Sequence, residues 1–272
     1  MCEFCTKHGD GRIWFKNAAN YAKDLMADLE RREYISEFLE TTMKDGIVTL
    51  GRLETLYRKR KRLPAKIVDS IVSQAKDDHF GQVLTMEEIR DIVMKAATVV
   101  RLPCACRWAS SHSEKRCCFS VSYTPDKWYN DLDMSTFGLA PDEGLESVSR
   151  EAAIAQMEAL EKEGAVHSIW TMKTPFIGAI CNCGPSDCLG LRFLSIDVQT
   201  MIKGETRAEV TEDLCDGCGA CEDACHFEAI SSHQLSGEDK AVVNADTCYG
   251  CGLCRNACSS NALTMVDRGG SY

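Results

Sequence analysis

The sequence lacks several patterns that would each have indicated a class of protein. No apolar stretch reaches the ~18 residues that a membrane helix requires. The first residues, MCEFCTKHGDG, have neither the basic start nor the apolar middle of a secretory signal. Neither G-x-G-x-x-G nor G-x4-G-K-[ST] occurs, so nothing supports a built-in dinucleotide or nucleotide loop. We therefore expect a cytoplasmic protein without a membrane span.

Cysteine, in contrast, is abundant: the chain has 17 among 272 residues. In a reducing compartment such a number indicates metal binding rather than a disulfide framework, and an odd total cannot pair completely. The net charge of −10 is unevenly distributed. Residues 205–268 carry twelve acidic and four basic side chains, whereas residues 51–66 carry seven basic side chains and one acidic. The segment 51–66 is therefore strongly basic, whereas the C-terminal segment 205–268 is acidic.

The C-terminal part contains an internal repeat. LCDGCGACEDACHFEAI at 214–230 matches TCYGCGLCRNACSSNAL at 247–263, and each copy contains C-x2-C-x2-C-x3-C. Glycines between the cysteines permit positive φ and let backbone N–H groups approach a cluster. Zinc bound by the C-x2-C pairs is the alternative, but zinc sites do not require a run of four cysteines or its repetition.

Residues 207–268 closely resemble the bacterial-type ferredoxin module with two 4Fe-4S clusters. The resemblance implies short hairpin strands, each followed by a cluster loop and a short helix. In that family the fourth cysteine of each run ligates the other cluster. The usual proline after it is replaced by His226 and Ser259. The implied ligand sets are Cys215, Cys218, Cys221 and Cys258 for the first cluster, and Cys248, Cys251, Cys254 and Cys225 for the second.

Nine further cysteines precede this module: Cys2, Cys5, Cys104, Cys106, Cys117, Cys118, Cys181, Cys183 and Cys188. TVVRLPCACRW and FIGAICNC are typical of strands, and residues i and i+2 of a strand point to the same side. We therefore expect Cys104 with Cys106, and Cys181 with Cys183, to direct thiolates at one point. A helix capped by Ser147 or Ser149 and ended at Gly164 joins the two segments.

Residues 101–192 also resemble the cysteine-rich module that precedes a two-cluster ferredoxin in predicted iron–sulfur proteins of anaerobes. The order P-C-x-C-R, helix, EGAVH and C-N-C-x4-C carries the resemblance. It implies one or two additional 4Fe-4S clusters, three or four in total. A structural zinc and buried free thiols are the alternatives. Adjacent Cys117 and Cys118 cannot both readily reach one cluster, and the sequence leaves the choice between them open.

The expected fold class is α+β. We predict a helical N-terminal region with a C-x2-C start at 1–100, a cysteine-rich cluster-binding module at 101–204 and a two-cluster ferredoxin domain at 205–272. Apolar periodicity indicates helices within 17–43, 64–78 and 85–97, and Thr85 with Glu88 forms a capping box. The basic run at 52–66 is typical of a solvated face or a docking surface for an acidic protein, and we expect no nucleic-acid partner.

Iron–sulfur clusters exchange single electrons. The primary hypothesis is therefore an electron-transfer protein that connects a low-potential donor with an acceptor enzyme, as a carrier or an oxidoreductase subunit rather than a self-contained enzyme. One alternative is a reductase whose upstream cluster has an open iron site. Another is a redox-sensing regulator. The sequence identifies no catalytic residue.

Overall fold

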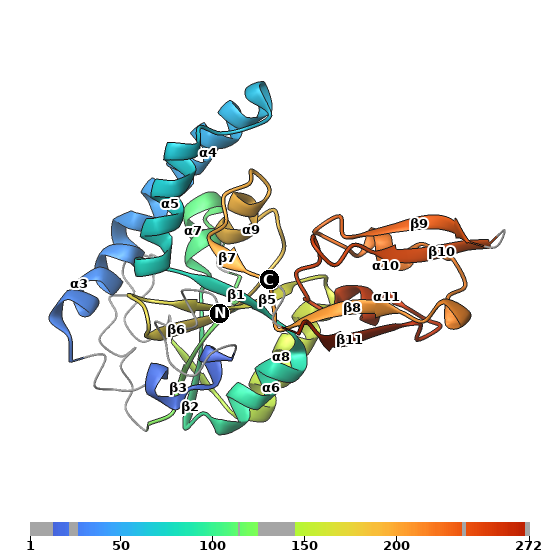
Figure 1. Cartoon of the computed structure of the whole chain (residues 1–272). Helices are drawn as coiled ribbons and strands as arrows, with labels where there is room; N and C mark the ends of the chain where they lie inside the picture. The colour runs from blue at the N-terminus through green and yellow to red at the C-terminus, as the bar shows by residue number, and fades with distance from the viewer. Residues whose placement is uncertain (1–12, 22–26, 114, 125–144, 236–237, 270–272) are drawn as a thin grey trace.

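The computed structural model describes residues 13–21, 27–113, 115–124, 145–235 and 238–269. It has the α+β class expected from the sequence, with a large mixed sheet in the body and a ferredoxin-type unit at the C-terminus. Figure 1 shows the C-terminal unit on one side of the body. Of the helices in the described ranges, none combines the length and apolar character that crossing a bilayer requires.

A seven-stranded sheet organises the body, in the order β4-β2-β3-β6-β5-β1-β7. All neighbouring strands are antiparallel except β1 and β7. The three central strands are almost entirely buried, which explains their β-branched and aromatic composition. The strands are β1 (Gly81–Leu84), β2 (Thr98–Leu102), β3 (Cys118–Ser122), β4 (Glu146–Val148), β5 (Val166–Thr171), β6 (Ile177–Cys183) and β7 (Met201–Ile202).

Two capped helices pack side by side against this sheet: α6 (Met86–Lys95) and α8 (Arg150–Lys162). The capping box of Thr85 and Glu88 is present at the start of α6. The Ser149 hydroxyl caps α8 by accepting a hydrogen bond from the N–H of Ala152. Gly164 follows α8 with φ 87°, as the predicted helix end required.

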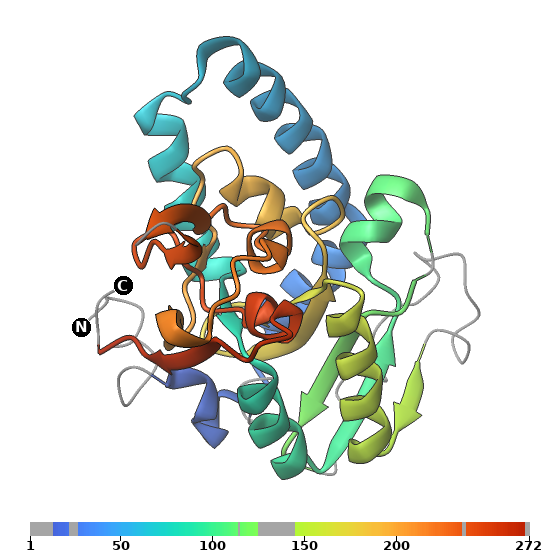
Figure 2. The ribbon, with the colours of Figure 1, turned by 90° about the vertical axis from the view of Figure 1, so that its right-hand side faces the viewer.

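The N-terminal part forms two short 3₁₀ turns (Trp14–Lys16 and Ala18–Tyr21) and a chain of helices. Helix α3 (Leu29–Glu37) passes through a π-helical turn (Phe38–Thr42) into α4 (Met43–Arg60), which is followed by α5 (Ala65–Asp78). Helices α4 and α5 form a hairpin whose tip extends away from the body (Figures 1 and 2). The basic run lies at this tip, where Arg58, Lys59 and Arg60 occupy the last turn of α4. Their positive charge is favourable there, because the C-terminal end of a helix carries a partial negative charge.

The segment around Cys104 differs from the sequence-based expectation. We expected extended chain from Cys104 to Cys106, but Cys104 is the N-cap of α7 (Ala105–Ser111) and Cys106 lies in its first turn. Pro103 ends β2 because it cannot donate a ladder hydrogen bond, and the chain turns into the helix directly after it. The two thiols therefore do not share a strand face. Cys181 and Cys183, in contrast, both lie in β6.

The C-terminal unit contains two antiparallel strand pairs related by the sequence repeat. Strand β8 (Thr206–Val210) pairs with β11 (Leu263–Asp267), and β9 (Ile230–Leu235) pairs with β10 (Glu238–Val243). Each copy places a short helix after its first cysteines, α10 (Ala220–Asp223) and α11 (Leu253–Ala257). The α9 helix (Leu189–Leu194) and β7 precede this unit in the body.

Candidate metal centres

The eight cysteines of the C-terminal repeat line two separate cavities. Cys215, Cys218, Cys221 and Cys258 line one, and Cys248, Cys251, Cys254 and Cys225 line the other. These are the two sets implied by the ferredoxin resemblance, each with its fourth cysteine supplied by the other copy of the repeat. The arrangement arises because the paired strands bring the end of each run beside the start of the other.

Backbone N–H groups donate to four of these sulfur atoms in a repeated pattern. Ala208 N–H donates to Cys248 Sγ at 3.5 Å, and Ala241 N–H donates to Cys215 Sγ at 3.4 Å. A second pair, from Ala229 to Cys225 and from Ala262 to Cys258, has distances of 3.3 Å each. Each alanine and its counterpart occupy the same position of the repeat. Hydrogen bonds of this kind stabilise thiolate and tune an iron–sulfur potential, so the donor set fits a cluster.

Seven of these eight thiols are at least partly buried. Burial raises the pKa of Cys251 and of Cys254 to about 12. Without a metal these thiols therefore carry protons at neutral pH, and metal binding releases them. Cys218 is the exception, because its side chain is exposed.

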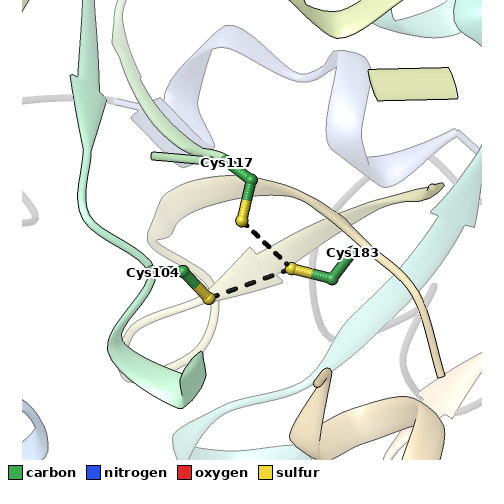
Figure 3. Close-up of side chains that lie close together, drawn as sticks. All are labelled: Cys104, Cys117 and Cys183. Carbon is green, nitrogen blue, oxygen red and sulfur yellow. Dashed lines mark hydrogen bonds between the residues drawn. The ribbon is translucent and has the colours of Figure 1, made fainter. Parts of the chain in front are cut away.

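A second cysteine group lies at the centre of the body. Sγ of Cys183 is 3.8 Å from that of Cys104 and 3.4 Å from that of Cys117, and the three sulfur atoms converge in Figure 3. They come from the N-cap of α7, the residue before β3 and the end of β6. All three are buried, and within the described chain they form a compact set of potential metal ligands.

The other predicted upstream ligands lie around this thiol trio. Cys118 and Cys181 are cross-strand partners with sulfur atoms 3.7 Å apart, so Cys117 joins the trio while Cys118 pairs with Cys181. Cys106 points to Met43, with its Sγ 3.6 Å from the thioether sulfur. Burial raises the pKa of Cys188 to about 12. The predicted ligands Cys2 and Cys5 lie outside the described residues.

Neighbouring side chains favour the thiolate form of one member of the trio, Cys104. Cys106 first, and then Cys117, Cys118 and Cys183, hold the pKa of Cys104 well below its ordinary value through side-chain hydrogen bonds. Arg107 is largely buried and forms an ion pair with Asp187 at 2.9 Å. Burial lowers its pKa, but the negative charge of Cys117, Asp187, Cys183 and Cys104 raises it above the ordinary value. The guanidinium therefore offsets negative charge at the trio.

A cavity of about 440 Å³ opens beside the upstream cysteines. Its wall includes Cys104 and Cys183 of the trio, as well as Cys106, Cys181 and Cys188. Helices α3, α4 and α5 and the π-helical turn cover it. Sequence reasoning missed this cavity, because its wall combines short segments between residues 34 and 200 that carry no shared motif.

One hydrophobic core connects the two cysteine groups. Cys251 and Leu253 of the C-terminal unit belong to the same buried cluster as Cys104, Cys117 and Cys183. Phe227 and Tyr249 pack against that cluster, and their rings stack with centroids 4.5 Å apart. A second buried cluster, within the C-terminal unit, contains Cys221 of the other cavity together with Cys248 and Cys254.

Comparison with protein families identifies a 4Fe-4S dicluster domain at residues 214–262. This match indicates at least two 4Fe-4S clusters in the C-terminal unit, and with the clustered cysteines it supports an iron–sulfur electron-transfer role. A ferredoxin-like domain also suggests redox partners. No curated protein matches the chain.

Proposed function

We propose that the protein relays single electrons through three or four 4Fe-4S clusters between a low-potential donor and an acceptor enzyme, as a cytoplasmic carrier or oxidoreductase subunit. The observation that carries the proposal is the grouping of the eight repeat cysteines around two cavities, four to each. The resemblance to bacterial-type ferredoxins and to multi-cluster proteins of anaerobes gives the same assignment. The N–H···S hydrogen bonds support it, because they suit thiolates that hold iron.

The ligand sets proposed for the C-terminal clusters are those implied by the resemblance. Cys215, Cys218, Cys221 and Cys258 hold one cluster, and Cys248, Cys251, Cys254 and Cys225 hold the other. For the upstream cluster we propose Cys104, Cys117 and Cys183 as ligands, because their sulfur atoms converge at a buried point beside Arg107. Cys106, Cys118, Cys181 and Cys188 are candidates for a fourth ligand, and Cys2 and Cys5 for a further cluster.

The packing suggests an order for the relay. The set containing Cys251 adjoins the core of the upstream trio, so it is the inner cluster of the C-terminal unit. The set containing exposed Cys218 is then the outer one, where a partner docks. Twelve acidic side chains between residues 205 and 268 make a basic partner surface favourable, since charge complementarity accelerates association.

The test is metal quantitation on anaerobically purified protein. The C-terminal unit alone accounts for about eight irons, one upstream cluster raises the total to about twelve, and two raise it to about sixteen. Electron paramagnetic resonance before and after dithionite then reports reversible reduction. Spectra that dithionite leaves unchanged would contradict the relay.

A second candidate function is supported by the cavity beside the trio. Three converging thiols can bind three irons of a 4Fe-4S cluster and leave the fourth iron without a cysteine ligand. Two of these three thiols, Cys104 and Cys183, lie on the cavity wall. An upstream cluster with an open iron site would make the protein a reductase rather than a carrier. Spectroscopy showing four sulfur ligands at every iron of the upstream cluster would exclude this candidate.

A further inference from the structure

We propose that the cavity beside the upstream cysteines binds an uncharged, planar aromatic redox molecule of the quinone class. This inference rests on the proposed electron-transfer function and identifies an acceptor for it. The volume of about 440 Å³ lies within the range of small-molecule sites, and it includes the space beside the five cysteines where the upstream cluster would sit. The wall contains the aromatic side chains Tyr34, Phe38 and Trp170 together with Met43 and Phe193, which favour a flat, apolar ligand.

Charge on the wall selects against anions. The acidic side chains on it are Glu37 and Asp78, and the basic one is Lys173. Lys173 Nζ lies 2.9 Å from Asp78 Oδ1 and 3.1 Å from Glu30 Oε1, so its charge is already compensated. Glu37 forms no ion pair in the described part of the chain. A phosphate-bearing nucleotide is therefore disfavoured relative to a neutral quinone.

His79 lies on the wall of this cavity and carries a hydrogen-bond acceptor. Its Nδ1 lies 2.7 Å from the carbonyl oxygen of Thr171, which only accepts, so Nδ1 carries the proton. In the neutral ring Nε2 is then an acceptor, and the described residues provide no donor to it. The ring stacks on Trp170 with centroids 4.7 Å apart. A hydroquinone hydroxyl can donate to Nε2, whereas a quinone carbonyl cannot, so the site favours the reduced molecule.

The redox balance is that of quinone reduction. Clusters held by the cysteines would supply two electrons, one at a time, from the low-potential donor, which is the number needed to convert a quinone to its hydroquinone. The molecule takes up two protons from water in the same process. Cys104, Cys106, Cys181, Cys183 and Cys188 lie on the cavity wall, so the bound molecule and the cluster ligands share one boundary.

Equilibrium dialysis of oxidised holoprotein under argon tests the proposal. The probe is 2,3-dimethyl-1,4-naphthoquinone, because both positions that thiols attack are blocked. The matched anion is 2-hydroxy-3-methyl-1,4-naphthoquinone, which is ionised at neutral pH. We expect saturable binding of the neutral probe and at least about tenfold weaker binding of the anion. Absence of binding by the neutral probe, or equal binding of the anion, overturns the proposal. Binding of riboflavin without binding of the naphthoquinone overturns the quinone assignment.

Two pairs of variants locate the site. Thr42 is exposed on the cavity wall, whereas Thr41 is exposed outside it. T42W should therefore weaken the binding of both the naphthoquinone probe and its hydroquinone, and T41W should weaken neither. His79→Phe keeps the aromatic stack and should weaken hydroquinone binding about three- to tenfold, the effect of one lost hydrogen bond, with the exposed His233→Phe as control. Equal binding by T42W and T41W would place the site elsewhere. Iron content and the response to dithionite, measured on the same samples, report on the relay separately from quinone binding.

Discussion

Two glycines in the first cysteine loop have the same backbone conformation but different surroundings, and this allows a controlled test of the cluster fold. Gly217 has φ 71° and Gly219 has φ 77°. A Cβ on Gly217 would overlap the backbone carbonyl of Asp239, whereas a Cβ on Gly219 meets no protein atom within 4 Å. The repeat provides the same comparison, because a Cβ on Gly250 would overlap the carbonyl oxygen of Thr206, while one on Gly252 first meets the flexible end of Arg255 at 3.6 Å.

The expected magnitudes follow from this difference. An alanine held at left-handed φ costs about 1 kcal/mol at either position. At Gly217 and Gly250 the loop must also move away from a backbone oxygen of the adjacent strand. Such overpacking costs about 1 to 3 kcal/mol more. We therefore expect G217A and G250A to be destabilised by about 2 kcal/mol relative to G219A and G252A, a factor of about 30.

The assay is anaerobic cluster loss, followed as bleaching of visible absorbance in the presence of an iron chelator. If opening of the loop relieves the overlap, G217A should lose its absorbance up to about 30 times faster than G219A. G250A and G252A should show the same ratio, which tests the equivalence of the two copies. Equal rates within both pairs would refute the reasoning, because left-handed φ alone would then account for the effect.

Three further predictions concern the body. C117S should lose about four irons per chain and C118S should retain them, because Cys117 belongs to the thiol trio and Cys118 pairs with Cys181; equal losses would contradict this. Burial lowers the pKa of His79 from 6.5 to about 4. Between pH 6.5 and pH 4 the unfolded chain therefore binds a proton at this residue that the folded chain does not bind. The free energy of unfolding should therefore fall as pH decreases from 6.5 towards 4. In thermal unfolding, the melting temperature of H79F should depend less on pH over this range than that of the unsubstituted protein. Arg192 donates two hydrogen bonds of 2.9 Å to Glu54, joining α9 to α4; R192K should lower the unfolding free energy by about 0.5 to 1 kcal/mol in denaturant titrations, and an unchanged midpoint would show that the pair contributes nothing.

Local patterns were sufficient for much of the fold. The capping box at Thr85 and the glycine at 164 depend only on neighbouring residues, and the structure confirms both. The helix cap was left open between Ser147 and Ser149, and the structure shows that it is Ser149. The extended backbone expected from Cys104 to Cys106 was wrong, because the strand ends at Leu102, before Pro103, and the chain then enters a helix. Cys118 could be distinguished from Cys117 only through its cross-strand partner Cys181, which is distant in sequence.

The two proposed cluster sites of the C-terminal unit are evident from the sequence, because one dense, repeated run of cysteines and glycines contains every proposed ligand. The sites in the body depend on the tertiary structure. The thiol trio joins residues 104, 117 and 183, and the cavity beside it joins short segments between residues 34 and 200. No local spacing encodes such sets, since a sheet and its covering helices bring them together only when the buried core forms. That core also contains Cys251 of the C-terminal unit together with the three upstream thiols.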